Sequence, residues 1–216
     1  QAGTNSAQFS TNMKYFMNRY SSSDTPTVIT LNDNTGKALT TLVDNSALKQ
    51  KLKGYAIPKK EFFSFQTSDG ITLNGWMMEP ADFSAGKKYP VLMYQYSGPG
   101  SQQGLDKFGV SWETYMASQG YIVACVDGRG TGGRGAEFAK STYLNLGIKE
   151  AKDLVETALY LGRQPYVDKD RIGIWGWSYG GYMTIMSMRE GTPVFKAGVA
   201  VAPVTDWNYY DTVYGE

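Results

Sequence analysis

Gly176-Trp-Ser-Tyr-Gly-Gly181 is the stretch that decides the fold of this 216-residue chain. It fits the pattern G-x-S-x-G, in which a strand ends at a sharp turn and a helix begins. Residues 172–175 supply an apolar strand before the turn, and residues 179–188 supply a helix after it. Glycines on either side of the serine lack the Cβ atoms that would clash at so tight a turn. The pattern therefore predicts a strand–turn–helix unit that pushes the hydroxyl of Ser178 outward as a candidate nucleophile.

Ser178 is not accompanied by a histidine, because the chain contains none. A serine hydroxyl is a weak nucleophile that needs an adjacent base, and that base is almost always histidine. Either the motif is coincidental, or the chain is a piece of an enzyme whose other catalytic residues lie outside it.

The composition is that of an ordinary globular chain, with 42% apolar and 19% charged residues. The 21 basic and 20 acidic residues leave a net charge of +1, which indicates neither a nucleic-acid partner nor an anionic membrane. No apolar run reaches the ~20 residues of a membrane-spanning helix. The first ten residues lack the basic and apolar regions of a signal peptide, although a signal could lie upstream of an internal fragment.

Cys125 is the only cysteine, so no disulfide can form within the chain. It lies in the apolar run 121–126, where we expect a buried and inert thiol rather than a catalytic one. Because one cysteine and no histidine exclude a zinc site of the usual kind, we predict neither a metal nor a cofactor.

Residues 1–45 differ in character from the rest of the chain. Predicted strands at 13–20, 26–31 and 37–43 are separated by turn sequences. Three such strands make less than a self-sufficient sheet, so we expect one blade or meander of something larger. Residues 46–60 are expected to form a connector, with a short helix over 45–52 that is capped by Asn45 or Ser46.

Residues 61–216 alternate predicted strands and helices. A hairpin is expected around Ser68-Asp-Gly70, a tripeptide that favours a tight turn. The other predicted strands are 89–96, 121–126, 171–177 and 196–202, and the predicted helices are 111–118, 146–163 and 179–189. This order predicts an α/β fold with a mainly parallel sheet and helices on both faces. The apolar face of the helix over 146–163 is expected to comprise Ile148, Ala151, Val155, Ala158 and Leu159.

An acyl-transfer serine also needs donors for the developing oxyanion. The N–H of Tyr179, directly after the nucleophile, is the expected first donor. The second is expected from residues 96–100, where Pro99 has no N–H and the Tyr96 hydroxyl becomes attractive. A strand-end tyrosine packed in the core is an equal alternative for Tyr96 on the residues alone.

Two further groups follow predicted strands. The glycine-rich residues 127–135 lack the ending of a phosphate-binding P-loop, so we expect a loop shaped by glycines and pinned by Asp127 and Arg129. After the last strand come the aromatic residues Trp207, Tyr209, Tyr210 and Tyr214. They could line an apolar pocket on the rim of the sheet, although aromatic clusters taken alone more often belong to a core.

Four stretches are more specific than the serine motif alone. They are Tyr96-Ser-Gly-Pro-Gly-Ser-Gln102, Val126-Asp-Gly-Arg-Gly-Thr-Gly132, Gly173-Ile-Trp-Gly-Trp-Ser-Tyr-Gly-Gly-Tyr182 and Val201-Ala-Pro-Val-Thr-Asp-Trp-Asn-Tyr-Tyr-Asp-Thr-Val-Tyr214. Together they closely resemble the dipeptidyl peptidase IV branch of the prolyl oligopeptidase family. The resemblance implies an incomplete α/β-hydrolase fold, with the first two-thirds of that domain at 61–216. It also implies that the last strands of a β-propeller precede it at 1–45.

The resemblance also implies a function. It points to a serine peptidase that releases N-terminal dipeptides with proline, or less well alanine, in second position, through an acyl-enzyme. Ser178 would be the nucleophile, and the Tyr179 N–H and the Tyr96 hydroxyl would form the oxyanion hole. The pocket for the proline ring would be lined by Tyr179, Val204, Trp207, Tyr210 and Tyr214.

The chain departs from the family pattern at the triad. In the family the catalytic Asp and His follow the position of Glu216, and the paired glutamates that hold the substrate's amino group precede Gln1. Neither Asp206 nor Asp211 matches the triad acid. The chain alone is therefore expected to be inactive, since loss of the base costs about 10⁶-fold in such a triad. The resemblance further implies a homodimer that is periplasmic, secreted or membrane-anchored.

Alternative functions stay open. One is a non-catalytic binding or scaffold chain that keeps the hydrolase fold without the triad. Against it, residues 196–202 would form an uncovered apolar edge strand, which stable proteins avoid. Another is a prolyl tripeptidyl peptidase or an acylaminoacyl peptidase, each of which releases a different product.

Overall fold

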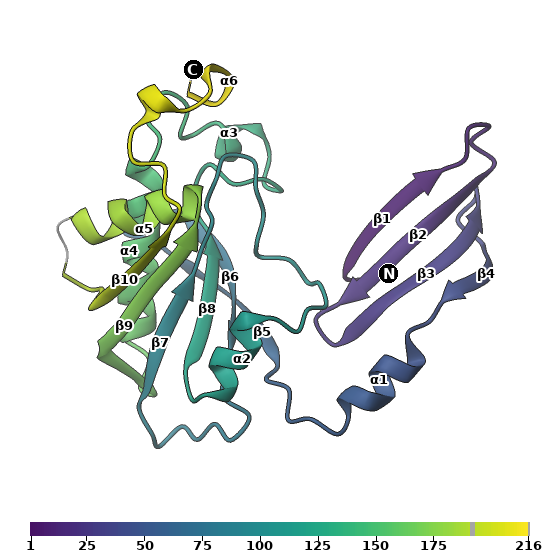
Figure 1. Ribbon diagram of the computed structural model, residues 1–216, viewed down its shortest axis with the longest axis horizontal. Coiled ribbons are helices and arrows are strands. Elements are labelled where there is room, and N and C mark those ends of the chain that lie inside the picture. The colour runs from purple at the N-terminus through teal and green to yellow at the C-terminus, as the bar shows by residue number, and fades with distance from the viewer. Residues whose placement is uncertain (191–192, 216) are drawn as a thin grey trace.

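The N-terminal part forms an antiparallel sheet of its own. The computed structural model describes residues 1–190 and 193–215, and Figure 1 shows two sheets joined through a short helix. The N-terminal strands lie side by side in chain order. They are β1 (Thr4–Phe9), β2 (Tyr15–Ser22), β3 (Thr25–Asp33) and β4 (Ala38–Val43). The three strands predicted here are confirmed, with boundaries that shift by a few residues.

The sequence does not predict β1. Its residues, Thr-Asn-Ser-Ala-Gln-Phe, are mostly polar and exposed, so they lack the apolar alternation that signals a strand. The strand forms because its backbone pairs with β2, from Thr4 opposite Ser21 to Phe9 opposite Phe16. Its conformation thus depends on its neighbour more than on its own propensity.

The connecting helix α1 (Ser46–Leu52) begins without the side-chain cap expected from the sequence. Asn45 occupies the cap position in a left-handed conformation, with φ 50° and ψ 27°. Its side-chain amide instead donates to the carbonyl of Thr27 at 2.6 Å. The carboxylate of Asp44 accepts the N–H of Ser46 at 2.9 Å. Asn45 is therefore the N-cap residue, one of the two predicted positions, but its side chain ties the helix to β3 and makes no capping hydrogen bond.

The C-terminal sheet has the order β10-β9-β7-β8-β6-β5. Its strands are β5 (Lys60–Gln66), β6 (Thr72–Met78), β7 (Tyr89–Tyr94), β8 (Ile122–Asp127), β9 (Val167–Trp177) and β10 (Ala197–Val201). The pairings from β10 to β8 are parallel, whereas β6 pairs antiparallel with both β8 and β5. The mainly parallel sheet and the hairpin are thus confirmed.

Helices cover both faces of this sheet, as predicted (Figure 1). The α4 (Ile148–Gly162) and α5 (Tyr179–Arg189) helices pack on one face, and α2 (Trp112–Ser118) packs on the other. The sheet has an apolar core on each face, because successive strand residues point to opposite faces. Met77 packs with the residues of α4 and α5, whereas its neighbour Trp76 packs with α2. Short helices that the sequence does not predict follow strand ends; they are α3 (Ala136–Ala139), η1 (Trp207–Tyr209) and α6 (Thr212–Gly215).

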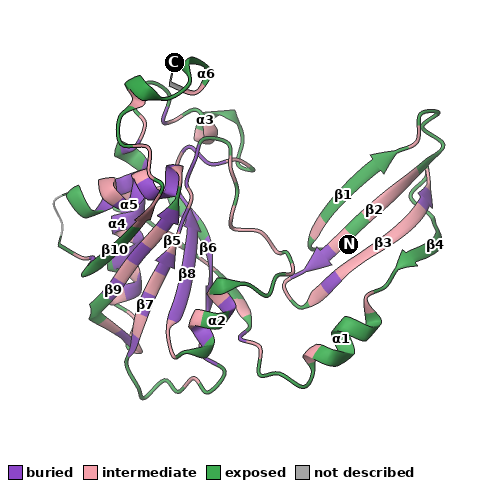
Figure 2. Cartoon of the chain, in the orientation of Figure 1, coloured by how far each residue is buried: buried purple, intermediate pink, exposed green. Residues whose placement is uncertain are grey.

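The core lies in the C-terminal part, where every residue of β8 is buried. In Figure 2 its central strands are largely purple, whereas the N-terminal sheet is mostly pink and green. Cys125 on β8 is fully buried, and burial raises the pKa of its thiol well above the usual range. The predicted burial of the Cys125 thiol is confirmed.

The apolar face of α4 differs in part from the prediction. Ala151, Val155 and Ala158 are buried as expected, but Ile148 is 61% exposed and Leu159 is 37% exposed. Two acidic residues, Glu150 and Asp153, are buried instead. The helical periodicity places both residues off the apolar face. It contains no information on residues from other elements that could pair with a buried acid.

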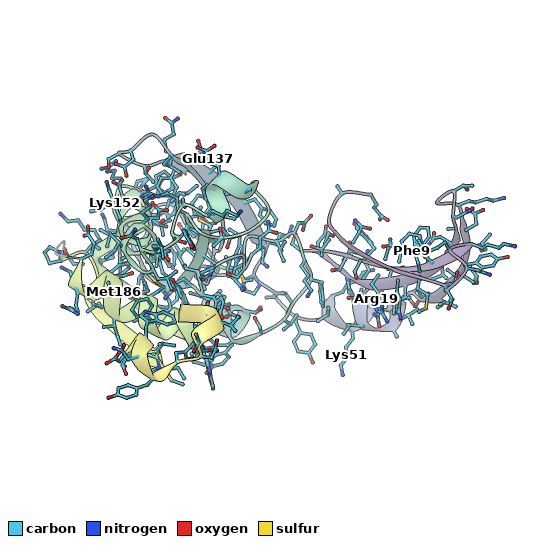
Figure 3. The ribbon with its side chains drawn as sticks, turned by 90° about the horizontal axis from the view of Figure 1, so that it is seen from above. Phe9, Arg19, Lys51, Glu137, Lys152 and Met186 are labelled. Carbon is cyan, nitrogen blue, oxygen red and sulfur yellow. The ribbon has the colours of Figure 1, made fainter. Side chains whose placement is uncertain are left out.

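The two parts touch through the long loop 97–111. The carbonyl of Asp106 accepts the hydroxyl of Thr4 at 2.7 Å, and its carboxylate accepts the N–H of Ser23 at 2.6 Å. Figure 3 shows Phe9 on the N-terminal sheet, apart from Lys152 on the C-terminal helices. Among the described residues, no helix is long and apolar enough to cross a membrane. The boundaries near residues 45 and 60 stay a prediction.

Candidate active site

Ser178 lies at the turn between β9 and α5 in a strained conformation, with φ 58° and ψ −117°. Its N–H donates to the carbonyl of Val201 on β10 at 2.9 Å, and its carbonyl accepts the N–H of Tyr182 at 3.1 Å. A non-glycine residue at positive φ persists only where its surroundings hold it, and such residues cluster at functional sites. The strand–turn–helix unit predicted around Ser178 is therefore present.

The glycines of the motif allow β7 to pass close to the turn. A Cβ added at Gly176 would lie 2.5 Å from the carbonyl oxygen of Gln95, and one at Gly180 would overlap the same oxygen. Both glycines are thus required by the close approach of the β7 end, as the sequence predicts.

Gln95, which the sequence interpretation overlooks, ties the end of β7 to α5. Its side-chain amide donates to the carbonyl of Gly180 at 2.7 Å and to the hydroxyl of Thr184 at 3.1 Å. Its backbone N–H donates to the carbonyl of Trp175 on β9 at 3.2 Å. A fully buried amide in an otherwise apolar strand is the signal that could have revealed this role, since buried polar groups need partners.

Tyr96 follows Gln95 and is thereby brought beside Tyr179, the residue after Ser178. Its ring centroid lies 6.2 Å from that of Tyr179. Tyr96 is half-buried and packs against the main core cluster. The geometry brings together the two residues expected to form the oxyanion hole.

The loop after Tyr96 is braced by residues 127–132. The carboxylate of Asp127 accepts the N–H groups of Gln103 and Gly104, at 2.8 and 2.7 Å. Backbone bonds also link Gly100 to Gly130 and Gly132 to Ser101, each at 2.8 Å. The glycine-rich loop therefore acts as a structural clamp, as predicted.

Arg129 holds the clamp to helix α4. Its guanidinium donates to Asp153, with Nη2 at 2.6 Å and Nε at 3.0 Å from Oδ1, and its Nη1 lies 3.4 Å from Asp69. The backbone N–H of Arg129 also donates to Asp153 at 2.7 Å. The predicted pinning role of Arg129 is confirmed, and its partner explains why Asp153 is buried.

An aromatic cluster surrounds the Tyr179 ring, which is 2% exposed. The Trp207 and Tyr214 rings lie 5.8 and 6.1 Å from it, and Tyr210 lies 5.7 Å from Trp207 and 5.5 Å from Tyr214. Val204, whose side chain is aliphatic, is half-buried in the same segment. Tyr209, by contrast, is 90% exposed.

The two acids after β10 serve local turns. The carboxylate of Asp206 accepts the N–H of Asn208 at 2.9 Å, and that of Asp211 accepts the N–H of Tyr214 at 2.9 Å. Both residues are exposed. Because the sequence contains no histidine, the chain supplies a candidate nucleophile and candidate oxyanion donors without the usual base.

Comparison with known proteins finds a matching family model and similar sequences. The model of the "Prolyl oligopeptidase family" matches residues 108–216. A "probable dipeptidyl-aminopeptidase B" of Arthroderma gypseum is 48% identical over 85% of this chain and 20% of its own length. A "probable dipeptidyl peptidase 4" of Aspergillus flavus is 38% identical over 98% of this chain and 28% of its own.

Solved structures align over almost the whole chain. The crystal structure of Porphyromonas gingivalis dipeptidyl peptidase 4 is 55% identical, with a TM-score of 0.95 over 99% of this chain and 30% of that one. A putative dipeptidyl aminopeptidase IV from Bacteroides ovatus is 40% identical, with a TM-score of 0.91 over 100% of this chain and 31% of that one. The chain thus spans less than a third of the length of each of these proteins.

Proposed function

This chain belongs to the prolyl oligopeptidase family, in its dipeptidyl peptidase IV branch, and from that premise we propose that it is part of a serine exopeptidase. The whole protein releases Xaa-Pro, or less well Xaa-Ala, dipeptides from the N-termini of peptides. One observation carries the proposal: the strained turn at Ser178 lies directly beside Tyr96 and an aromatic cluster.

Ser178, Tyr179 and Tyr96 each have a distinct role in this reaction. The hydroxyl of Ser178 attacks the carbonyl of the second substrate residue, the peptide bond after that residue breaks, and the remaining peptide leaves with a free, newly protonated amino group. Water then hydrolyses the resulting acyl-enzyme, which releases the dipeptide and restores the Ser178 hydroxyl. The N–H of Tyr179 and the hydroxyl of Tyr96 donate to the oxyanion. The base that takes the proton from Ser178 and the acid that orients that base come from the remainder of the protein.

The pocket for the second residue is apolar and aromatic. We assign it to Tyr179, Val204, Trp207, Tyr210 and Tyr214. Four of these side chains are joined through ring contacts, which suits the compact, apolar ring of proline. An alanine methyl group buries less surface in such a pocket and is therefore a poorer substrate.

The rest of the protein completes the assembly. We assign residues 1–45 to the end of a β-propeller, residues 46–60 to a linker and residues 61–216 to the first two-thirds of the catalytic domain. Val199 on the edge strand β10 is apolar and 57% exposed. Such an edge supports the proposal that another part of the protein packs against β10. We also propose that the whole protein is a homodimer and is periplasmic or secreted.

A chromogenic assay tests the proposal. The full-length protein is expected to release Ala-Pro and Gly-Pro dipeptides, and Ser178→Ala is expected to abolish release, whereas residues 1–216 alone are inactive. Sequencing the products distinguishes dipeptide from tripeptide or acylated residue release. A full-length protein that neither cleaves these substrates nor is labelled at Ser178 by a fluorophosphonate would instead fit a non-catalytic binding chain.

A further inference from the structure

Glu150 is a buried acid to which the proposed mechanism gives no role. It lies in the first turn of α4 and is 1% exposed. Its Oε2 accepts the N–H of Gly147 at 3.0 Å, and its Oε1 accepts the hydroxyl of Tyr179 at 2.7 Å. A buried carboxyl group costs stability unless its oxygens are paired, and apolar residues often replace buried ionisable groups without loss. The presence of a buried acid here therefore points to the partner that it holds.

That partner, Tyr179, joins the two halves of the proposed site. Its backbone N–H is the first oxyanion donor, and its ring lies among those of Tyr96, Trp207 and Tyr214, with centroids 6.2, 5.8 and 6.1 Å away. A change in the ring position would therefore alter the pocket wall and the neighbourhood of the Tyr96 hydroxyl together.

A second tyrosine of α5 reinforces the same attachment. The hydroxyl of Tyr182 donates to the carbonyl of Leu146 at 3.0 Å, just before α4 begins. The rings of Tyr179 and Tyr182 meet edge to face, with centroids 5.5 Å apart. The first turn of α5, which follows Ser178, is thus fastened at two points to the start of α4. Of these two attachments, the one made by Glu150 holds a ring of the aromatic cluster, that of Tyr179.

We propose that Glu150 is a positioning residue for the proline pocket, which fixes the Tyr179 ring through its hydroxyl and so sets the preference for proline over alanine in the second position. This role rests on the proposed function. A proline ring gains contacts with every wall of a pocket that is held still, whereas an alanine methyl group touches fewer of them. If the Tyr179 ring is no longer held by Glu150, proline binding is therefore weakened more than alanine binding.

The experiment uses the full-length protein with Gly-Pro and Gly-Ala chromogenic substrates. Active sites are counted by titration with a small phosphonylating reagent that reacts at Ser178 and carries no proline group. In Glu150→Ala, kcat/KM for Gly-Pro is expected to fall about tenfold per titrated site, mainly through KM, because a buried hydroxyl loses its partner. The value for Gly-Ala should fall less, so the ratio of the two decreases.

Glu150→Gln is the conservative rescue. Its amide oxygen can accept the Gly147 N–H while its amide nitrogen donates to the Tyr179 hydroxyl oxygen. The proline-to-alanine ratio should then stay within about twofold of that of the wild type. Glu137→Ala is the matched control, since Glu137 is an exposed acid in the first turn of α3 and is labelled in Figure 3. That variant should leave the ratio unchanged.

Tyr179→Phe removes the same hydrogen bond from the other side and keeps the ring, in case Glu150→Ala fails to fold. It should lower the ratio, and adding Glu150→Gln should lower it no further. An unchanged ratio per titrated site in Glu150→Ala or Tyr179→Phe, with an active wild type, overturns the positioning role alone. A wild type that releases no dipeptide from either substrate overturns the proposed function and this role with it.

Discussion

Tyr96 and Tyr179 divide the proposed oxyanion hole between a side-chain donor and a backbone donor. Tyr96→Phe keeps the ring that packs against the core and removes only the hydroxyl. Loss of one oxyanion donor costs about 10²-fold to 10³-fold in kcat, so we expect a fall of that order in the full-length protein. KM should change little, because the hydroxyl acts on the developing charge rather than on the bound substrate. Steady-state kinetics with Ala-Pro substrates measure both quantities.

Tyr94→Phe is the matched control for that variant. Tyr94 lies two positions earlier and packs against the α2 face of the sheet. Its hydroxyl lies 3.4 Å from the side-chain oxygen of Gln103, away from the turn. If Tyr94→Phe and Tyr96→Phe reduced kcat equally, the assigned role of Tyr96 would be wrong.

Asp127 gives the clamp a predicted pH dependence. Burial raises the pKa of its carboxyl group, although the N–H groups of Gln103 and Gly104 partly oppose the shift. Because the folded pKa lies above the unfolded value of about 4, the folded state binds the proton more tightly. The contribution of this group is most favourable below that value and is lost as pH rises through the folded pKa.

The Asp127→Asn variant removes this titration. Its melting temperature relative to the wild type should therefore move in favour of the variant as pH rises from about 4 towards neutrality. Calorimetry of both full-length proteins at several pH values measures the difference. A difference that is constant, or that moves against the variant, would contradict the raised pKa.

At single residues, the sequence predicts a motif with its own local backbone better than it predicts which buried side chains pair with each other. The turn at Ser178 was predictable because its motif specifies the local backbone, whereas the roles of Tyr96 and Trp207 follow from the family resemblance and stay predictions. Glu150 and Asp153 could not, because their burial depends on Tyr179 and Arg129, which are distant in the chain. A helical pattern contains no information on partners of that kind.

Among the elements, the turn between β9 and α5 depends most on glycine. A Cβ at Gly180 would overlap the carbonyl oxygen of Gln95 and lie 3.2 Å from the Cα of Tyr96. Gly180→Ala should therefore push the β7 end away from α5 and displace Tyr96. We expect a lower melting temperature and a loss of peptidase activity in the full-length protein, because both neighbours are backbone and cannot rotate aside.

Gly109→Ala is the control for that substitution. Gly109 lies in the exposed loop before α2, and an added Cβ would meet no atom within 4 Å. This variant should keep the activity and the melting temperature of the wild type. Full activity in Gly180→Ala would show that β7 can move without cost to the site.

Elements were predictable where apolar residues recur with a clear period. The buried strands β7 and β8 and helix α5 lie where their patterns place them. β1 was not, since a polar edge strand takes its conformation from pairing with β2. The four-residue helices α3 and α6 are too short to show a period.

For the whole molecule, the C-terminal sheet is the α/β-hydrolase part, and the antiparallel strands before it belong to a propeller. The contact between them involves the same loop that follows Tyr96. Asp106 in that loop accepts bonds from Thr4 and Ser23, and residues 103–104 are held by Asp127. The oxyanion side of the proposed site is therefore connected to the N-terminal sheet.

Asp106→Ala tests whether this connection matters for catalysis. The variant loses the carboxylate that accepts the Ser23 N–H at 2.6 Å but keeps the carbonyl that accepts the Thr4 hydroxyl. Loss of one hydrogen bond of about 1 kcal/mol should increase hydrogen exchange at Ser23 and in residues 97–106. It should lower kcat only about fivefold, because the Asp127 clamp still holds the loop nearer to Tyr96. Asp82→Ala, at an exposed acid in the turn before β7, should change neither quantity. Faster exchange with an unchanged kcat would show that the N-terminal sheet is joined to the loop without influencing Tyr96.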